Sequence, residues 1–112
     1  MSTPPGEIDP RAAAASAADG SALLLDVRED DEWAAGHIAG AQHIPLSRID
    51  LAAVPSDRPV IAVCRSGNRS GRVAAALAGA GIEVSNLVGG MLAWHEAGLP
   101  VVQDGGAPGF VK

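Results

Sequence analysis

The chain has 112 residues, of which 47% are hydrophobic and only 3% aromatic, and its formal net charge at pH 7 is −5. This length indicates one domain with one hydrophobic core, and the apolar content excludes a disordered chain. No apolar run approaches the roughly 18 residues of a membrane span, and the start lacks the pattern of a secretory signal. The acidic balance argues against a nucleic-acid surface. We therefore expect a cytoplasmic protein that binds neither nucleic acid nor a membrane.

The first predicted element is a short helix. Residues 1–7 are polar and contain proline, which is typical of a flexible N-terminus. In the stretch 9–20, Asp9 is a favourable N-cap and Pro10 suits the first helical position. Gly20 is a stop signal. These caps predict an ordered helix in spite of the alanine run between them.

Strands are predicted where the chain is apolar. Residues 22–27 (ALLLDV) and 59–64 (PVIAVC) are continuous apolar runs without alternation. This pattern is typical of strands that are buried on both faces of a parallel sheet. Residues 41–46 and 82–88 are weaker strand candidates.

Helical segments alternate with these strands. We expect short helices at 30–36, 46–54, 70–81 and 90–98, each closed by glycine or proline, with Ser47 as a candidate N-cap of the second. Alternating strands and helices imply right-handed crossovers. The pattern therefore predicts a three-layer α/β fold.

The only cysteine, Cys64, ends the second strong strand, at the edge where open α/β sheets bind ligands. A single cysteine permits neither an internal disulfide nor a cysteine-based zinc cage. Residues 65–69 must turn sharply into a helix that starts near Ser70. Gly67 and Asn68 tolerate positive φ, so that backbone N–H groups can converge into an anion-binding nest. The N-terminus of the helix adds its positive dipole end.

Arginines gather after this cysteine. Seven of the eight basic residues are arginines, and Arg65, Arg69 and Arg72 follow Cys64 closely. A positive pocket on an acidic chain indicates a small anionic ligand. A thiol in this setting should ionise below its free pKa of about 8.5 and act as a nucleophile without a general base. The alternative is an inert buried cysteine in an ordinary turn, but it gives the arginines no role.

The segment CRSGNRS, with LLDVREDDEWAAGHIAGAQHIPL before it and LVGGMLAWHEAGLPV after it, resembles the rhodanese family of sulfurtransferases. The resemblance spans residues 8–102 and corresponds to one domain of this family. It implies a three-layer α/β/α sandwich around a five-stranded parallel sheet. The glycine-rich residues 103–112 are predicted to form a flexible C-terminal tail.

The resemblance implies transfer of a sulfane sulfur without a cofactor or metal. Cys64 would attack the outer sulfur of thiosulfate, release sulfite and become a persulfide. Cyanide or a thiol would then remove the sulfur, and a thioredoxin-like protein or a low-molecular-weight thiol could supply that thiol. Thiosulfate is a compact dianion that Arg65 and Arg69 can attract. The substrate-binding residues predicted on this basis are Arg65, Ser66, Gly67, Asn68, Arg69 and Ser70.

Two other functions are compatible with a cysteine loop of this kind. Phosphatases and arsenate reductases on related folds place five residues between the cysteine and an arginine, whereas four separate Cys64 from Arg69. The shorter loop suits a sulfur atom better than a tetrahedral phosphate, which disfavours these enzymes. A persulfide carrier that relays sulfur from a partner protein stays open as the main alternative.

Polar residues outside the loop are predicted to have structural roles. Asp26 and Arg28 end the first strong strand, and we expect them to support the site through an ion pair or a cap. The histidines have no ligand-like spacing with each other or with the cysteine. We therefore expect His37 and His43 to be hydrogen-bonded and His95 to lie at the surface, and we predict no metal site.

Two tryptophans and a glycine pair are also expected to shape the domain. Trp33 and Trp94 are expected to be packing anchors, and Gly89 and Gly90 are expected to form a tight turn beside the cysteine loop. The acidic run 29–32 is expected to be the solvated start of a helix, favourable to the helix dipole.

Overall fold

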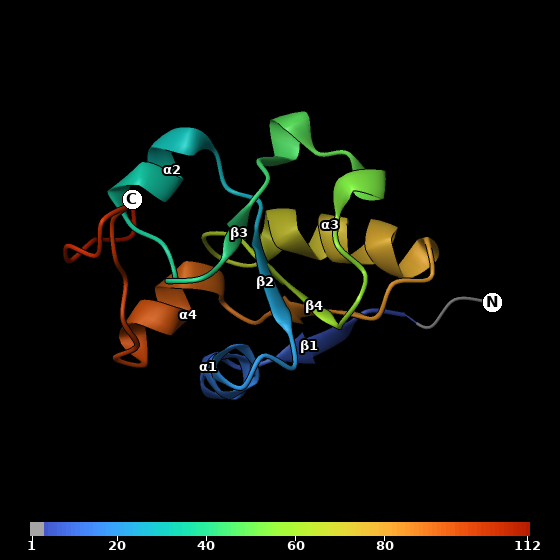
Figure 1. Cartoon of the computed structure of the whole chain (residues 1–112), viewed down its shortest axis with the longest axis horizontal. Coiled ribbons are helices and arrows are strands. Elements are labelled where there is room, and N and C mark those ends of the chain that lie inside the picture. Colours follow the sequence, from blue (N-terminus) through green and yellow to red (C-terminus); the bar gives the residue numbers. More distant parts are fainter. Residues whose placement is uncertain (1–3) are drawn as a thin grey trace.

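The computed structural model describes residues 4–112, and within this range the strands form one parallel sheet of five strands. Their order across the sheet is β1-β5-β4-β2-β3 (Figure 1). The strands are β1 Gly6–Ile8, β2 Leu23–Asp26, β3 Gln42–His43, β4 Val60–Val63 and β5 Val84–Leu87. The two strong apolar runs thus become the neighbouring strands β2 and β4, as predicted, and all four residues of each are buried.

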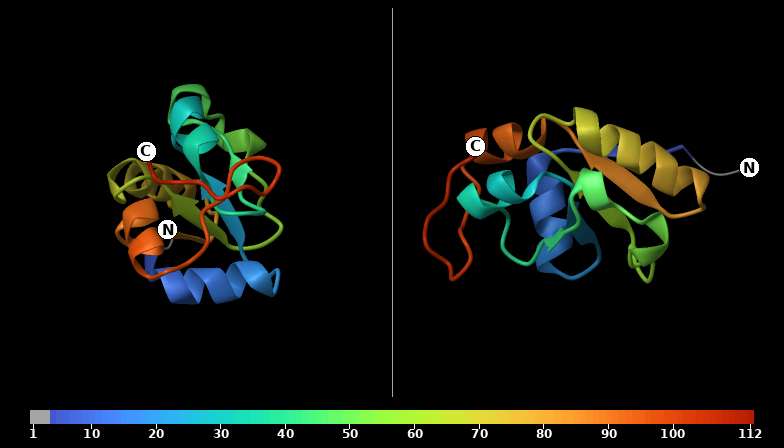
Figure 2. Two further views of the ribbon diagram at one scale, coloured as in Figure 1. Left: turned by 90° about the vertical axis from the view of Figure 1, so that its left-hand side faces the viewer. Right: turned by 90° about the horizontal axis from the view of Figure 1, so that it is seen from above.

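Helices cover both faces of the sheet (Figures 1 and 2). They are α1 Pro10–Ala18, α2 Asp30–Ala35, α3 Asn68–Gly79 and α4 Gly90–Glu96. Alternate residues of one strand point to opposite faces. Ala62 of β4 accordingly packs in the core with α3, whereas its neighbour Ile61 packs with α1 and α4. The predicted three-layer α/β/α sandwich is confirmed.

The caps predicted for the first helix are present. The Asp9 side chain accepts a hydrogen bond of 2.9 Å from the Ala12 N–H, and Pro10 is the first helical residue. The side chain of Ala13 is fully buried against the sheet. Local capping signals and burial of one helix face therefore agree for α1.

The prediction of a helix at residues 46–54 is wrong. The chain makes two short 3-10 turns, Leu46–Arg48 and Leu51–Ala53, and the second is capped by Asp50, whose side chain accepts from the Ala52 N–H. Ser47 is not an N-cap. Its hydroxyl donates instead to the Glu29 carboxylate at 2.5 Å. Apolar side chains of this stretch pack against the α3 side of the core, and this packing replaces a regular helix with two turns.

Both ends of the described chain carry ordered contacts. β1 begins at Gly6, two residues before the domain boundary predicted from the sequence, and pairs with β5. Near the other end, the Phe110 N–H donates to the Ala35 carbonyl, and the C-terminus lies beside α2 (Figure 1). Residues 1–3 lie outside the described range. The flexibility predicted for residues 1–7 and 103–112 stays a prediction.

In residues 4–112, the helices are too short or too polar to cross a lipid bilayer.

Candidate active site

Cys64 lies directly after β4, at the carboxyl edge of the sheet. Its side chain points to the α3 side of the core, and the residue is 1% exposed. Gly67 then takes the left-handed conformation, with φ 107°, and turns the chain into α3. The helix begins at Asn68, two residues earlier than predicted. Only a glycine adopts this backbone conformation without strain, which explains its place in the loop.

Hydrogen-bond donors of the loop converge on the sulfur of Cys64. The Gly67 N–H donates to Sγ at 3.0 Å, and the Ser70 hydroxyl donates to it at 3.2 Å. Burial by itself raises the pKa of the Cys64 thiol, but the hydrogen bonds of the Ser70 hydroxyl and of the backbone N–H groups of Ser70, Gly67 and Ser66 outweigh it and lower the pKa. The predicted nest is thus a cradle that favours a thiolate.

Asn86 of β5 holds this cradle, although it is not among the site residues predicted from the sequence. Its Nδ2 donates to the Gly67 carbonyl at 2.9 Å, and its Oδ1 accepts from the Ser70 hydroxyl at 2.6 Å. A hydroxyl has one hydrogen, so Asn86 and the Cys64 sulfur share the Ser70 proton. In the sequence, Asn86 stands out only as a polar residue within a strand candidate. Its position beside the cysteine loop depends on the pairing of β5 with β4, which the sequence does not show.

The start of α4 supports the same loop from another side. The Met91 N–H donates to the Cys64 carbonyl at 2.8 Å, and the Leu92 N–H donates to the Arg65 carbonyl at 3.0 Å. A Cβ on Gly90 would lie 2.6 Å from the carbonyl oxygen of Arg65, and it would also collide with the carbonyl of Cys64. Gly89 and Gly90 have φ angles of 74° and 60°. The predicted tight turn beside the cysteine loop is confirmed.

The arginines of the loop do not form an open cluster around the sulfur. Arg69 makes a two-pronged ion pair with Glu32 of α2, with N–O distances of 2.6 and 2.7 Å. This ion pair, opposed by partial burial, holds the pKa of Glu32 below its ordinary value. Arg65 is exposed and donates through Nε to the Lys112 carbonyl at 3.1 Å, and Arg72 is an exposed residue of α3. The charge of Arg69 is therefore balanced.

Asp26 and Arg28 form the ion pair that the sequence predicted. Both are buried, and Arg28 Nη2 lies 2.8 Å from the Asp26 carboxylate. Arg28 also donates to the carbonyls of Gly36 and Glu32. A guanidinium that is fully buried requires such partners on every side. The pair thus ties the end of β2 to α2, which carries Glu32.

The histidines and tryptophans take the structural roles predicted for them. His37 and His43 hydrogen-bond to the carbonyls of Trp33 and Arg28, and both rings stack on the Trp33 indole. Trp94 is buried and donates through Nε1 to a backbone carbonyl, whereas His95 is exposed. Trp33 of α2 thus packs against His37 and His43, and Trp94 packs α4 into the core.

The acidic run is more than a solvated helix start. Glu29 and Glu32 form a reciprocal capping box at the start of α2. Each of the four carboxylates also contacts a partner outside the helix; the pairs are Glu29–Ser47, Asp30–Arg48, Asp31–Lys112 and Glu32–Arg69. The run therefore anchors α2 to the segments around it.

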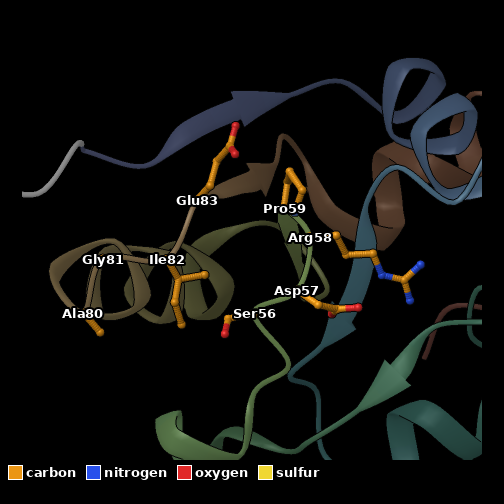
Figure 3. A pocket seen from close by; sticks show the side chains of 8 residues that line it. All are labelled: Ser56, Asp57, Arg58, Pro59, Ala80, Gly81, Ile82 and Glu83. Carbon is orange, nitrogen blue, oxygen red and sulfur yellow. The ribbon is translucent and has the colours of Figure 1, made fainter.

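A hollow of about 480 Å³ lies at the opposite edge of the sheet (Figure 3). Arg58 and Pro59, just before β4, form one wall, and Gly81 and Glu83, after α3, form the other. Cys64 lies at the other end of β4. None of the site residues predicted from the sequence lines this hollow.

The fold and the loop define a class of protein: a parallel α/β sandwich with a buried cysteine, cradled by hydrogen-bond donors, at the carboxyl edge of its sheet. The model of one family, the rhodanese-like domain, matches residues 9–97, and the chain belongs to this family. The rhodanese-related protein of Thermoplasma volcanium has a similar crystal structure, with a TM-score of 0.80 and 30% identity; the match covers 87% of this chain and 97% of that one.

Some of the curated relatives are named as sulfurtransferases. A sulfurtransferase of Allochromatium vinosum is 41% identical over 87 residues, which are 75% of this chain and 81% of that protein. The thiosulfate sulfurtransferase GlpE of Pseudomonas fluorescens is 40% identical over 77 residues, covering 66% and 71%. Other relatives are longer: the chain matches only 50% of an uncharacterized Synechocystis protein and 40% of a Mycobacterium tuberculosis transcriptional regulator.

Proposed function

We propose that this chain is a sulfurtransferase that carries a sulfane sulfur as a persulfide on Cys64. The observation that carries the proposal is the convergence of the Gly67 N–H and the Ser70 hydroxyl on the Cys64 sulfur. These donors favour the thiolate, which is the nucleophilic form of cysteine. The names of the relatives from Allochromatium and Pseudomonas support the same chemistry.

In the first half-reaction, the Cys64 thiolate attacks the outer sulfur of thiosulfate. A bond forms between Sγ and the outer sulfur, the S–S bond of thiosulfate breaks, and sulfite leaves with the electron pair. Negative charge then resides on the outer sulfur of the persulfide. The thiolate reacts without a general base, and the donors of the loop stabilise the anion before and after transfer.

In the second half-reaction, an acceptor attacks the outer sulfur of the persulfide. With cyanide, a C–S bond forms, the S–S bond breaks, thiocyanate leaves and the thiolate returns to its cradle. With a thiolate acceptor, a new persulfide leaves instead. We propose a thioredoxin-like protein or a low-molecular-weight thiol of the cytoplasm as the acceptor.

A carrier that accepts sulfur from a partner protein is the second candidate. The ion pair between Arg69 and Glu32 favours it, because a balanced guanidinium attracts free thiosulfate weakly. The same ion pair weighs further against a phosphatase. An arginine that makes a bidentate ion pair with a carboxylate is not available to bind a phosphate.

The test is sulfur loading of the single thiol. Incubation with thiosulfate should add about 32 Da to the intact mass, the weight of one sulfur on a persulfidated cysteine. Cyanide should remove this mass and release thiocyanate. The Cys64→Ser protein should neither gain the mass nor form thiocyanate. Thiocyanate formation by the Cys64→Ser protein would overturn the proposal. Loading by a persulfide but not by thiosulfate would favour the carrier.

A further inference from the structure

We propose that Glu32 is a specificity-determining residue that weakens the attraction of Cys64 for small dianions. By holding Arg69 in a two-pronged ion pair, it biases the site toward sulfur donors with a single negative charge, such as the persulfides of thiols. This inference rests on the proposed function and names the donor class that the site favours.

The contacts of Glu32 show that this pairing is built into the fold. The two N–O distances to Arg69 are 2.6 and 2.7 Å, and the side chains of Arg69 and Glu32 are only 32% and 15% exposed. Glu32 also accepts the Glu29 N–H at 3.1 Å, which fixes its carboxylate at the start of α2. The buried Arg28 donates to the Glu32 carbonyl and holds the same residue from behind. The carboxylate is therefore preorganised to meet the arginine.

The groups that donate hydrogen bonds to the Cys64 sulfur carry no charge of their own. The donors on Sγ are the Gly67 N–H and the Ser70 hydroxyl. A hydrogen-bond donor stabilises the single charge of a thiolate or persulfide at short range, but it does not attract a dianion from a distance as a guanidinium does. The cradle is thus suited to the reaction with a persulfide, R–S–S⁻. In that reaction the thiolate takes the outer sulfur, and the thiolate R–S⁻ leaves with the electron pair of the broken S–S bond.

Alkylation of Cys64 by two reagents of different charge tests the inference without any sulfur transfer. Iodoacetate carries one negative charge and iodoacetamide carries none. The rate with iodoacetate divided by the rate with iodoacetamide, called the alkylation ratio below, therefore reports the electrostatic potential at Cys64. Glu32→Gln keeps an oxygen for the capping box and removes the charge. It should raise the ratio about threefold. Asp31→Asn, which removes an exposed charge from the same helix, should change the ratio by less than about 1.5-fold at moderate salt.

Thiosulfate should respond more strongly than a monoanion, because Coulomb energy is proportional to charge. A threefold effect on a monoanion corresponds to about a ninefold rise in kcat/KM for thiosulfate in Glu32→Gln. The kcat/KM for cysteine persulfide, which carries one net negative charge, should rise only about threefold. Equal changes for both donors would overturn the inference, although the persulfide on Cys64 could still form.

The double variant Glu32→Gln with Arg69→Gln keeps the test valid if a single variant folds poorly. It removes two charges of opposite sign, so its alkylation ratio should stay within about 1.5-fold of that of the unchanged protein. Arg69→Gln alone should lower the ratio. A double variant whose ratio falls as far as that of Arg69→Gln would show that Arg69 attracts anions in spite of Glu32, and the inference would be wrong. An unchanged ratio in Glu32→Gln would contradict the inference as well.

Discussion

Replacement of Ser70 by alanine should raise the pH at which Cys64 becomes reactive. The Ser70 hydroxyl lies 3.2 Å from the sulfur and is fully buried, so water does not replace the lost donor. Its hydrogen bond contributes to a thiol pKa that lies below its ordinary value, against the opposing effect of burial. The backbone donors of the loop remain in the variant. We therefore expect a weakened thiolate that is still held in place.

The size of the effect follows from the sharing of one proton. A hydrogen bond to a charged group contributes about 1.5–3 kcal/mol, and the 2.6 Å contact of the same hydroxyl with Asn86 places Ser70 at the lower end. About 1.4 kcal/mol corresponds to a tenfold change in an equilibrium. The rate of alkylation by iodoacetamide at pH values below the midpoint should therefore fall about tenfold in Ser70→Ala.

The assay is the pH profile of alkylation by this neutral reagent, with a thermal melt to confirm that each variant is folded. Ser66→Ala is the matched control. The Ser66 side chain is exposed, and the residue contributes to the thiolate through its backbone N–H, which the substitution keeps. The reasoning fails if Ser70→Ala reacts with the midpoint of the unchanged protein, or if Ser66→Ala shifts the midpoint as far as Ser70→Ala.

Three further predictions concern the surroundings of the loop. Gly90→Ala should lower the free energy of unfolding by about 2–4 kcal/mol in a denaturant titration, because its Cβ would collide with the cysteine loop. Gly98 also has a positive φ but has open space around it, so Gly98→Ala should cost only about 1–2 kcal/mol. Equal losses in the two variants would contradict the collision. The pKa of Glu32 is held below its ordinary value of 4.5, so the carboxylate contributes about 1 kcal/mol or less to stability above that pH. This contribution is lost as the pH falls through the lower pKa of the folded state. The melting temperatures of Glu32→Gln and the unchanged protein should therefore converge in acid, and a difference that widened there would contradict the ion pair. One glycine inserted after Gly67 should move the hydrogen-bond donors away from the sulfur. The rate of thiosulfate cyanolysis should then fall at least tenfold, which corresponds to about 1.4 kcal/mol of activation free energy, while the protein still melts cooperatively. Full activity would show that loop length does not select the substrate.

Local signals in the sequence were sufficient for the two central strands, for the first helix and for the turn that holds Cys64. The apolar runs that became β2 and β4 predicted strands buried on both faces, since only a sheet covered on both sides hides such runs. Asp9 and Pro10 predicted the start of α1 because a cap acts within one turn. Cys64 and Gly67 predicted the cradle for the same reason: the turn from a strand into a helix brings N–H groups to the sulfur within a few residues.

The sequence was less informative where partners are distant along the chain. Arg69 and Glu32 are 37 positions apart, and nothing in their spacing shows that a carboxylate balances the guanidinium. Asn86 reaches Ser70 only because β5 lies beside β4 in the sheet. Local propensity also failed at residues 46–54, where packing against the core produced two turns in place of a helix.

The sequence by itself thus determined the α/β/α class, the strands that form the centre of the sheet and the place of the cysteine loop at its edge. Each of these depends on hydrophobic burial or on hydrogen bonds between near neighbours, which any compact arrangement of the chain must satisfy. The tertiary structure alone decided which charges face Cys64 and which residues hold its loop. Those contacts depend on the strand order β1-β5-β4-β2-β3, which the packing of the whole core selects.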